Sequence, residues 1–464
     1  MVEPNLARTT LGRDVPSERL RAAVDRARRS EFYSRHLTGH ALTTREDLAR
    51  LPLTFKHHLQ EASPFGMLAV PPASAWHYHE TSGTTGVPTS TWCGLTEVRM
   101  LADTLCSMVP ELSEGAILLN RFPLFAPASF IFEQALQSAH GCHIPAGNLT
   151  WDVPFLRALG FIRRLEVTAL ACLPFEAMLL RELALAQGLD FRREVESVRV
   201  IFCGGAALPT ALRRTIENDW DARVVEIYGS NEAMGLGISC PHGKLHLCTD
   251  LVEIEVLDPQ THVAVLPGDV GVLTVTSLVH EVMPLVRYVT DDLVRMDATP
   301  CPCGDERPTG TVLGRLDEVV ELDGHRITQY ELLDAVYEVA ERIGTRVFFV
   351  LIRHRGLHVI FEAESSRLPA HEAERALRDR LRMSLAVEFV ATGEVLDRGA
   401  LVRTPKIYKP GFVSDWRGAG KKSITIMEAM LEWPRFDLPA LLGIATRQIR
   451  NARRRRRLLR DDRL

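Results

Sequence analysis

Apolar residues recur at two different spacings along the chain, and these spacings predict two kinds of element. From about residue 17 to 37 they recur at helical spacing, which predicts a packing helix. Its apolar positions are Leu20, Val24 and Ala27, followed by Phe32 and Tyr33. Between about 88 and 288, short apolar runs such as GAILLN (115–120) and VTALACL (167–173) alternate with amphipathic segments. This alternation is typical of α/β layers with buried strands.

The pattern changes after Gly314, and the change predicts a second domain. The segment GRLDEVVELDGHRITQYELLDAVYEVA leads into the apolar strand RVFFVLIRH, the strand-like LHVIFEAE and a charged helix at about 369–383. We therefore expect a large N-terminal α/β domain at 1–315 and a small α+β domain at 316–420. The extension at 421–464 ends in the basic segment RNARRRRRLLRDDRL, either a solvated helix end or a docking site for an acidic partner or membrane surface.

Composition and charge narrow the range of functions. With 464 residues, 46% hydrophobic and 25% charged, the chain suits a folded protein of two or three domains. Its formal net charge of -4 offers no general reason to expect nucleic-acid binding. The N-terminus lacks an apolar signal core and no stretch approaches the roughly 18 apolar residues of a membrane span, so we expect a cytoplasmic protein. Nine cysteines, an odd number, favour reduced thiols or metal ligands over a disulfide framework.

The segment HETSGTTGVPTS (79–90) combines glycines with hydroxyl side chains. Gly83 and Gly86 would let backbone N–H groups approach an anion closely, and four hydroxyls add donors. The hydroxyl residues are Thr81, Ser82, Thr84 and Thr85. The loop lacks the spacing and the lysine of a Walker motif. Taken alone, it is explained equally well as a triphosphate cradle or as an ordinary surface turn.

Six stretches in a fixed order provide the context of this loop. TSGTTGVP looks like the phosphate loop of adenylate-forming enzymes, and RLPLTFKHHLQEASPFGMLAVPP before it looks like the lead-in of phenylacetate-CoA ligases. The other five are GGAALP (204–209), EIYGSNE (226–232), RYVTDDL (287–293), GRLDEVVELDGHRI (314–327) and RTPKI (403–407). The chain thus resembles the phenylacetate-CoA ligase-like branch of the adenylate-forming superfamily over about residues 40–410. The resemblance implies an α/β fold with a large N-terminal domain of layered sheets and helices and a small, mobile α+β C-terminal domain.

The resemblance also assigns roles to individual residues. Tyr228 would lie against adenine, Glu226 would accept a hydrogen bond from its amino group, and Asp292 would accept from the ribose hydroxyls. Glu232 would hold Mg²⁺, and Arg315 would reach the sugar or the phosphates. Further ATP-binding positions are residues 81–86, Gly205, Ala206 and Gly229, and the hinge position of the small domain is Asp317. In isolation, each of these polar residues would instead suit a cap or a solvated surface.

The implied chemistry is attack of a carboxylate oxygen on the α-phosphorus of ATP. Positioning and charge neutralisation supply most of the catalysis of such a step. Lys406 matches the family's catalytic lysine, with Glu232 and Thr85 as the other catalytic candidates. Because Pro405 stands where the family usually has glycine, Lys409 is an alternative.

The segment RFPLFAPASF (121–130) would border the pocket for the acid, although it differs from the aromatic, glycine-rich stretch expected there. Ala207 is a second departure, since phenylacetate-CoA ligases usually have Glu at this position. Phe122 and Phe125 are candidates for the pocket lining, and like Phe130 they would also suit the hydrophobic core. A pocket lined by such side chains would favour an aromatic or other apolar acid.

Two cysteine clusters indicate a metal site that takes no part in acyl activation. CPHGKLH (240–246) and CPC (301–303) could converge on one tetrahedral Cys₃His zinc site. Its ligands would be Cys240, His246, Cys301 and Cys303. Cys248 or His242 could replace one ligand, and the alternative is a group of unrelated free side chains. A closed four-ligand site would be structural.

The expected cofactors are therefore ATP, Mg²⁺, CoA and a structural Zn²⁺, with a carboxylic acid as substrate. After adenylation, the resemblance implies transfer to CoA as a thioester, and an amine or a carrier-protein thiol is the alternative acceptor. A catalytically silent nucleotide-binding homologue is a further alternative, against which Glu232 and Asp292 count. The assembly stays open, a homodimer included.

Overall fold

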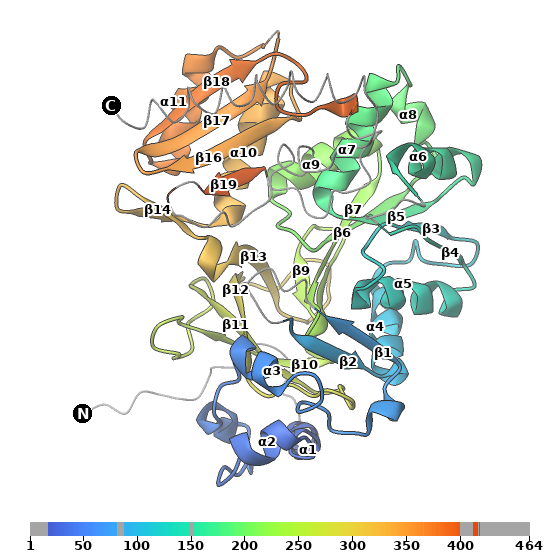
Figure 1. Ribbon diagram of the computed structural model, residues 1–464, viewed down its shortest axis with the longest axis vertical. Coiled ribbons are helices and arrows are strands. Elements are labelled where there is room, and N and C mark those ends of the chain that lie inside the picture. Colours follow the sequence, from blue (N-terminus) through green and yellow to red (C-terminus); the bar gives the residue numbers. More distant parts are fainter. Residues whose placement is uncertain are drawn as a thin grey trace, which may run out of the picture.

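The computed structural model describes residues 17–80, 88–147, 153–364, 366–399, 412–415 and 417. Most of them form a large α/β domain, and a smaller domain lies at one end of the molecule (Figure 1). Several segments that the sequence analysis singles out lie outside the described residues. They are the phosphate loop at 81–86, Lys406, Lys409 and the basic tail.

The large domain is built on one 11-stranded sheet with the order β10-β11-β12-β13-β9-β8-β7-β6-β5-β3-β4. Strands β3 to β7 pair in parallel, and the remaining neighbours are antiparallel. The parallel strands are β3 (Ile117–Asn120), β4 (Cys142–Pro145), β5 (Ala169–Cys172), β6 (Val200–Gly204) and β7 (Arg223–Ser230). The others are β8 (Met234–Ser239), β9 (Leu245–Leu247), β10 (Val252–Leu257), β11 (Val270–Ser277), β12 (Tyr288–Met296) and β13 (Thr309–Arg315).

Helices cover both faces of the parallel half of this sheet. On one face lie α6 (Phe155–Arg164), α7 (Pro174–Ala186), α8 (Phe191–Glu194) and α9 (Thr210–Trp220), and on the other α4 (Leu95–Met108) and α5 (Pro127–Ser138). Strands buried on both faces read as continuous apolar runs, and every residue of β5 and β6 is buried. The strands predicted within 115–120 and 167–173 are confirmed as β3 and β5.

The N-terminal helix expected from about 17 to 37 is divided in two. Helix α1 (Ser17–Ala27) ends before Ser30, and α2 (Glu31–His36) begins after it. The Ser30 hydroxyl accepts from the Tyr33 N–H at 3.2 Å, which caps a new helix. Apolar spacing continues through this break, so it could not reveal it. The next helix is α3 (Lys56–Ala62), and a hairpin of β1 (His77–Glu80) and β2 (Ser90–Cys93) follows.

In the part of the small domain that the structure describes, a four-stranded sheet of order β18-β17-β16-β19 is accompanied by two helices. Its elements are the hairpin β14 (Val320–Leu322) and β15 (His325–Ile327), α10 (Gln329–Ile343), β16 (Phe348–Arg353), β17 (Gly356–Glu362), α11 (Ala370–Leu381), β18 (Leu385–Val390) and β19 (Val413–Asp415). Thr328 and Glu331 form a reciprocal capping box at the start of α10. The charged helix expected at 369–383 is confirmed as α11.

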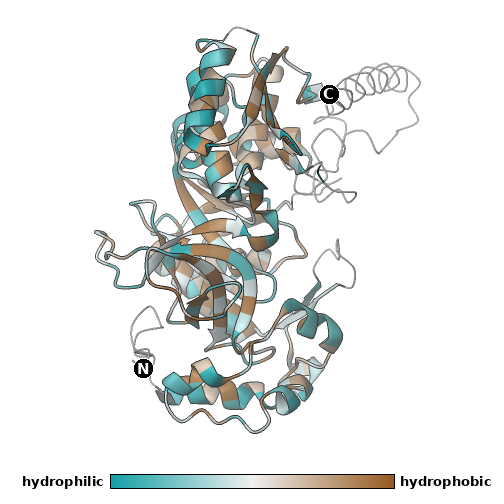
Figure 2. Cartoon of the chain, turned by 90° about the vertical axis from the view of Figure 1, so that its left-hand side faces the viewer, coloured by the Kyte–Doolittle hydropathy of each residue, from teal (hydrophilic) through white to brown (hydrophobic). Residues whose placement is uncertain are grey.

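Hydrophobic residues concentrate in the strands, while the outer faces of the helices carry hydrophilic residues (Figure 2). One hydrophobic core joins α7 and α9 to α10 and the small sheet, so the two domains pack against each other in this structure. Among the described helices, none has the length and apolar character that crossing a membrane requires.

Candidate functional site

Three predicted nucleotide-binding residues meet where β7, β12 and β13 lie near one another. The Tyr228 hydroxyl, on β7, donates to Asp292 Oδ2 at 2.7 Å. Asp292 on β12 is the register partner of Arg315 on β13, whose Nη1 lies 3.5 Å from Asp292 Oδ1. This group of residues, the Tyr228 cluster, assembles from segments that are far apart in the sequence.

Acidic groups outnumber basic ones around the Tyr228 cluster. Arg315 Nη2 lies 3.6 Å from Asp291 Oδ2, and its Nε lies 3.9 Å from Asp317 Oδ1. Burial raises the pKa of Asp292, and the bond from Tyr228 and the charge of Arg315 only partly offset this. Glu232 is buried and raises the same pKa through its charge, so its carboxylate is close by. Such a carboxylate-rich site fits a hard divalent cation, with Glu232 as the predicted Mg²⁺ ligand.

Glu226 has a partner that the sequence did not suggest. Its Oε2 accepts from Arg213 Nη2 on α9 at 2.9 Å, and Arg213 also donates to the Val224 carbonyl at 2.8 Å. Burial raises the pKa of Glu226, while Arg213 opposes the rise. A hydrogen bond from adenine to Glu226 would therefore have to share a carboxylate that already binds an arginine.

The predicted glycines lie where the backbone approaches other chain segments or solvent. Gly205 follows β6 with a φ of +73°, and both it and Ala206 are exposed. A Cβ at Gly229 would lie 2.0 Å from the Met234 carbonyl oxygen at the β7–β8 turn. Glycine is thus required at 229 to close the turn beside Tyr228.

The two phenylalanines proposed for the acid pocket lie in different environments. Phe122 is buried and stacks on Phe132, with 5.9 Å between ring centres, so it belongs to the core. Phe125 is 55% exposed, and its ring centre lies 5.8 Å from that of His79. Phe130 stacks on His77 at 3.8 Å. The segment therefore presents Phe125, rather than Phe122, on the side of the β1–β2 hairpin.

His79 was not recognised from the sequence. It is fully buried, its Nε2 lies 3.7 Å from Cys93 Sγ, and its Nδ1 has no hydrogen-bond partner in the described structure. Burial lowers its pKa to about 4, so the imidazole is neutral at physiological pH. The alternation HYHE, which places His77 and His79 on one face of a strand, was the available signal.

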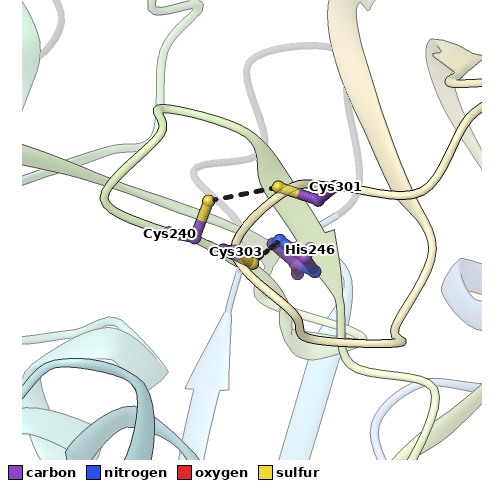
Figure 3. A group of neighbouring side chains, drawn as sticks. All are labelled: Cys240, His246, Cys301 and Cys303. Carbon is purple, nitrogen blue, oxygen red and sulfur yellow. Dashed lines mark hydrogen bonds between the residues drawn. The ribbon is translucent and has the colours of Figure 1, made fainter.

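The four predicted zinc ligands come together from the residue after β8, from β9 and from the loop before β13 (Figure 3). Their ligand atoms all lie within 4.8 Å of one another. Cys240 Sγ is 3.7 Å from Cys301 Sγ, and Cys303 Sγ is 3.3 Å from His246 Nε2. With bonds of about 2.3 Å to sulfur and about 2.0 Å to nitrogen, a tetrahedral zinc site requires ligand separations of roughly 3.8 and 3.5 Å. The observed separations are close to these values.

The second nitrogen of His246 is also held as a zinc ligand would require. Its Nδ1 lies 3.1 Å from the Arg307 carbonyl oxygen, so Nδ1 donates and Nε2 carries the free electron pair toward the cysteines. The alternative ligands Cys248 and His242 are not members of the group.

The hinge candidate Asp317 lies in the short 3₁₀ segment Leu316–Glu318, immediately after β13. Its position at the end of the large sheet separates the 11-stranded sheet from the elements of the small domain. The catalytic roles expected of Lys406 and Thr85 concern residues outside the described structure and remain predictions.

Comparison with known proteins shows what the chain as a whole is similar to. Residues 71–283 match a family model described as AMP-binding enzyme. The chain is 29% identical over 323 residues to a phenylacetate-coenzyme A ligase of Thermus thermophilus, covering 67% of this chain and 70% of that protein.

Solved structures show the same fold. A 2-hydroxyisobutyryl-CoA ligase in its postadenylation state, in complex with R3-HIB-AMP, superposes with a TM-score of 0.73 at 22% identity, covering 86% of this chain and 89% of that one. The same ligase with 2-HIB-AMP and CoA in its thioesterification state gives a TM-score of 0.61, with the same coverage and identity. The TM-score is thus higher with the postadenylation structure than with the thioesterification structure.

Proposed function

We propose, from the premise that this chain is a phenylacetate-CoA ligase-like member of the adenylate-forming superfamily, that it joins a carboxylic acid to CoA at the expense of ATP. The Tyr228 cluster carries this proposal, because three residues that the resemblance assigns to nucleotide binding lie in contact although they come from separate strands. The likeness to phenylacetate-CoA ligases over two thirds of the chain supports CoA as the acceptor.

In the first step, a carboxylate oxygen attacks the α-phosphorus, the bond to the bridging oxygen breaks, and pyrophosphate leaves. In the second step, the CoA sulfur attacks the acyl carbonyl carbon, AMP leaves, and the thiol proton passes to solvent. Asp292 would accept from the ribose hydroxyls, with Tyr228 fixing its carboxylate and Arg315 balancing its charge. Mg²⁺ held by Glu232 would neutralise phosphate charge. Lys406 is the proposed cation at the reacting centre, with Lys409 as the alternative.

The acid is proposed to be aromatic or otherwise apolar, since Phe125 is exposed beside the buried ring of His79. Phe122 is not part of this proposal, because its ring is enclosed in the core. A cytoplasmic location and a homodimer stay predictions from the sequence. Transfer to an amine or to a carrier-protein thiol is retained as the alternative.

Pyrophosphate release across a panel of aromatic, aliphatic and amino acids tests the proposal. Release with one acid that increases when CoA is added, together with formation of a thioester, would support an acyl-CoA ligase. Release that increases only with hydroxylamine would indicate an amine or carrier acceptor. An Asp292→Asn variant should lose most of the activity, and Asp25→Asn, on the exposed side of α1, is the matched control. Silence of the wild type across the whole panel would contradict the proposal.

A structural zinc ion is the second proposal for this chain. It rests on the separations within the Cys₃His group and on the orientation of His246. Purified protein should contain about one equivalent of zinc, and Cys301→Ser should lower both the zinc content and the melting temperature. Cys142→Ser, an exposed cysteine outside the group, is the control. Fewer than about half an equivalent of zinc in well-folded protein would count against the site.

A further inference from the structure

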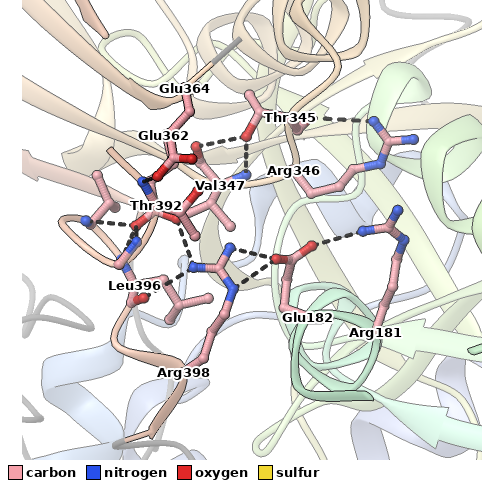
Figure 4. Close-up of polar contacts among 12 residues, drawn as sticks. Arg181, Glu182, Thr345, Arg346, Val347, Glu362, Glu364, Thr392, Leu396 and Arg398 are labelled. Carbon is pink, nitrogen blue, oxygen red and sulfur yellow. Dashed lines mark hydrogen bonds and ion pairs between the residues drawn. The ribbon is translucent and has the colours of Figure 1, made fainter. Parts of the chain in front are cut away.

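Arg398 links the two domains through a pair of carboxylates (Figure 4). Its Nη2 and Nε donate to Glu182 Oε2 on α7 of the large domain, at 2.5 and 3.1 Å. Its Nη1 donates to Glu362 Oε2 on β17 of the small domain at 2.7 Å. The exposed fractions of the three side chains are 17%, 10% and 2%, so the charges are largely shielded from water. We call this group the Arg398 bridge.

The small-domain side of the Arg398 bridge is held by several hydrogen bonds to Glu362. Glu362 Oε1 accepts from the backbone N–H groups of Gly393, Val395 and Leu396, at 3.0, 2.7 and 2.7 Å. One buried carboxylate thus fixes both Arg398 and the loop before it to β17. The segment RTPKI, which contains the proposed catalytic lysine, follows a few residues later in the sequence.

The large-domain side is supported by further charges. Glu182 Oε1 accepts from Arg181 Nη1 at 2.8 Å, and Arg181 Nε lies 3.3 Å from Asp219 Oδ2 on α9. Asp219 also pairs with Arg346 of the small domain at 2.9 Å, which is a second link between the domains. Opposite charges therefore alternate across the domain boundary, and each arginine contacts a carboxylate.

A third contact crosses the boundary at the N-terminus of α9. The preceding residue, Pro209, makes no side-chain cap. Instead, Asp334 Oδ1 of α10 accepts from the Ala211 N–H at 2.8 Å, and the Tyr330 hydroxyl lies 2.9 Å from Thr210 Oγ1. The Ala211 N–H and the Thr210 hydroxyl would lose these small-domain partners if the domains separated.

We propose that Arg398 is a positioning residue for the adenylation step: its bond to Glu182 holds β17 and the loop at 393–398 of the small domain against α7 of the large domain. This inference rests on the proposed function. In the thioester step the small domain would take another orientation, so the Arg398–Glu182 bond has to open before that step. The Arg398–Glu362 bond lies within the small domain and would move with it. The higher TM-score with the postadenylation structure of the related fold than with its thioesterification structure agrees with this assignment.

Glu182→Gln tests the inference because it removes only the charge on the large-domain side. The Arg398–Glu362 pair and the loop at 393–396 should stay intact in this variant. We expect pyrophosphate release, trapped with hydroxylamine and without CoA, to fall on the order of tenfold. Thioester formation from chemically prepared acyl-adenylate and CoA should remain within about twofold of wild type. Glu194→Gln, which weakens the pair between Glu194 and the exposed Arg163 within the large domain, should change neither step.

Hydrogen exchange provides a readout that needs no activity. In Glu182→Gln, the peptide that contains Thr210 and Ala211 should exchange faster, because the cap from Asp334 opens more often. Unchanged exchange, or an equal loss in both half-reactions, would overturn the inference. If wild-type protein releases no pyrophosphate with any acid, the proposed function fails, while the exchange result still decides whether the Arg398 bridge holds the domains together.

Discussion

Replacing Arg121 should destabilise the large domain strongly, because its guanidinium is one half of a fully buried ion pair. Arg121 Nε donates to Glu176 Oε1 on α7 at 2.5 Å, and the side chains are only 1% and 2% exposed. Nη1 donates to the Val153 carbonyl at 2.5 Å, and the guanidinium lies 5.3 Å from the centre of the Phe155 ring. Arg121 is also the first residue of the 121–130 segment, so the Arg121–Glu176 pair fixes the beginning of the segment that contains Phe125.

Arg121→Met removes the charge while keeping much of the side-chain volume. Glu176 would then be buried without a cation, and breaking a buried pair in this way costs about 3–5 kcal/mol. Burial raises the pKa of Glu176 already in the intact protein, and Arg121 opposes that rise. Without Arg121 the folded-state pKa rises further above the unfolded value, so the folded variant binds a proton that the unfolded chain releases. The variant should therefore lose stability as the pH rises and regain part of it toward low pH.

Melting temperatures at pH 5.5 and pH 8 measure this effect. A loss of about 3–5 kcal/mol lowers the melting temperature of a domain of this size by roughly 6–20 °C, with the larger drop at pH 8. The double variant Arg121→Met/Glu176→Leu removes both charges and should recover most of the loss. A single variant within about 2 °C of wild type at both pH values, or a double variant as unstable as the single one, would refute this reasoning.

Three smaller changes test other parts of the site. Tyr228→Phe removes only the hydroxyl that donates to Asp292. The KM for ATP in pyrophosphate release should therefore rise roughly 2- to 10-fold. An unchanged KM would count against the Tyr228 cluster as the nucleoside site. Gly229→Ala should lower the melting temperature because its Cβ would lie 2.0 Å from the Met234 carbonyl, whereas Gly160→Ala, with no atom within 4 Å, should be neutral or stabilise by up to about 1 kcal/mol. Burial lowers the pKa of His79 to about 4, so the free energy of unfolding of the wild type should decline as the pH falls from about 6.5 toward 4. His79→Gln should flatten that decline. The same pH dependence of the unfolding free energy in both proteins, measured by urea unfolding at each pH, would contradict this prediction.

The sequence predicts elements well where a single physical rule dominates. Strands β3 and β5 are buried on both faces, so their apolar runs stand out from the amphipathic helices around them. The break between α1 and α2 is different, because Ser30 caps a helix without interrupting the apolar spacing. A hydroxyl residue in a helical pattern is common, and only its backbone conformation shows that it ends one helix and begins another.

Some residues of the candidate site could likewise be predicted from the sequence, and others could not. Cys240, Cys301 and Cys303 could be grouped as candidate metal ligands in advance, because cysteines are rare and their clustering is informative. Tyr228, Asp292 and Arg315 were placed together only through the resemblance to a family, since no local rule relates residues so far apart. The separation of Phe122 from Phe125 could not be predicted, because both lie in one apolar segment and burial depends on which helix covers it.

Contacts between the domains are the hardest feature to predict. Arg398, Glu182 and Asp219 are ordinary charged residues in helices and loops, and each alone would suit a solvated surface. They form ion pairs between the domains because α9 and α10 pack together, which brings carboxylates of the large domain close to arginines of the small domain. A boundary made only of apolar contacts would favour a single orientation of the small domain. Charged groups, in contrast, regain hydration when they separate, which suits the opening proposed for the Arg398–Glu182 bond.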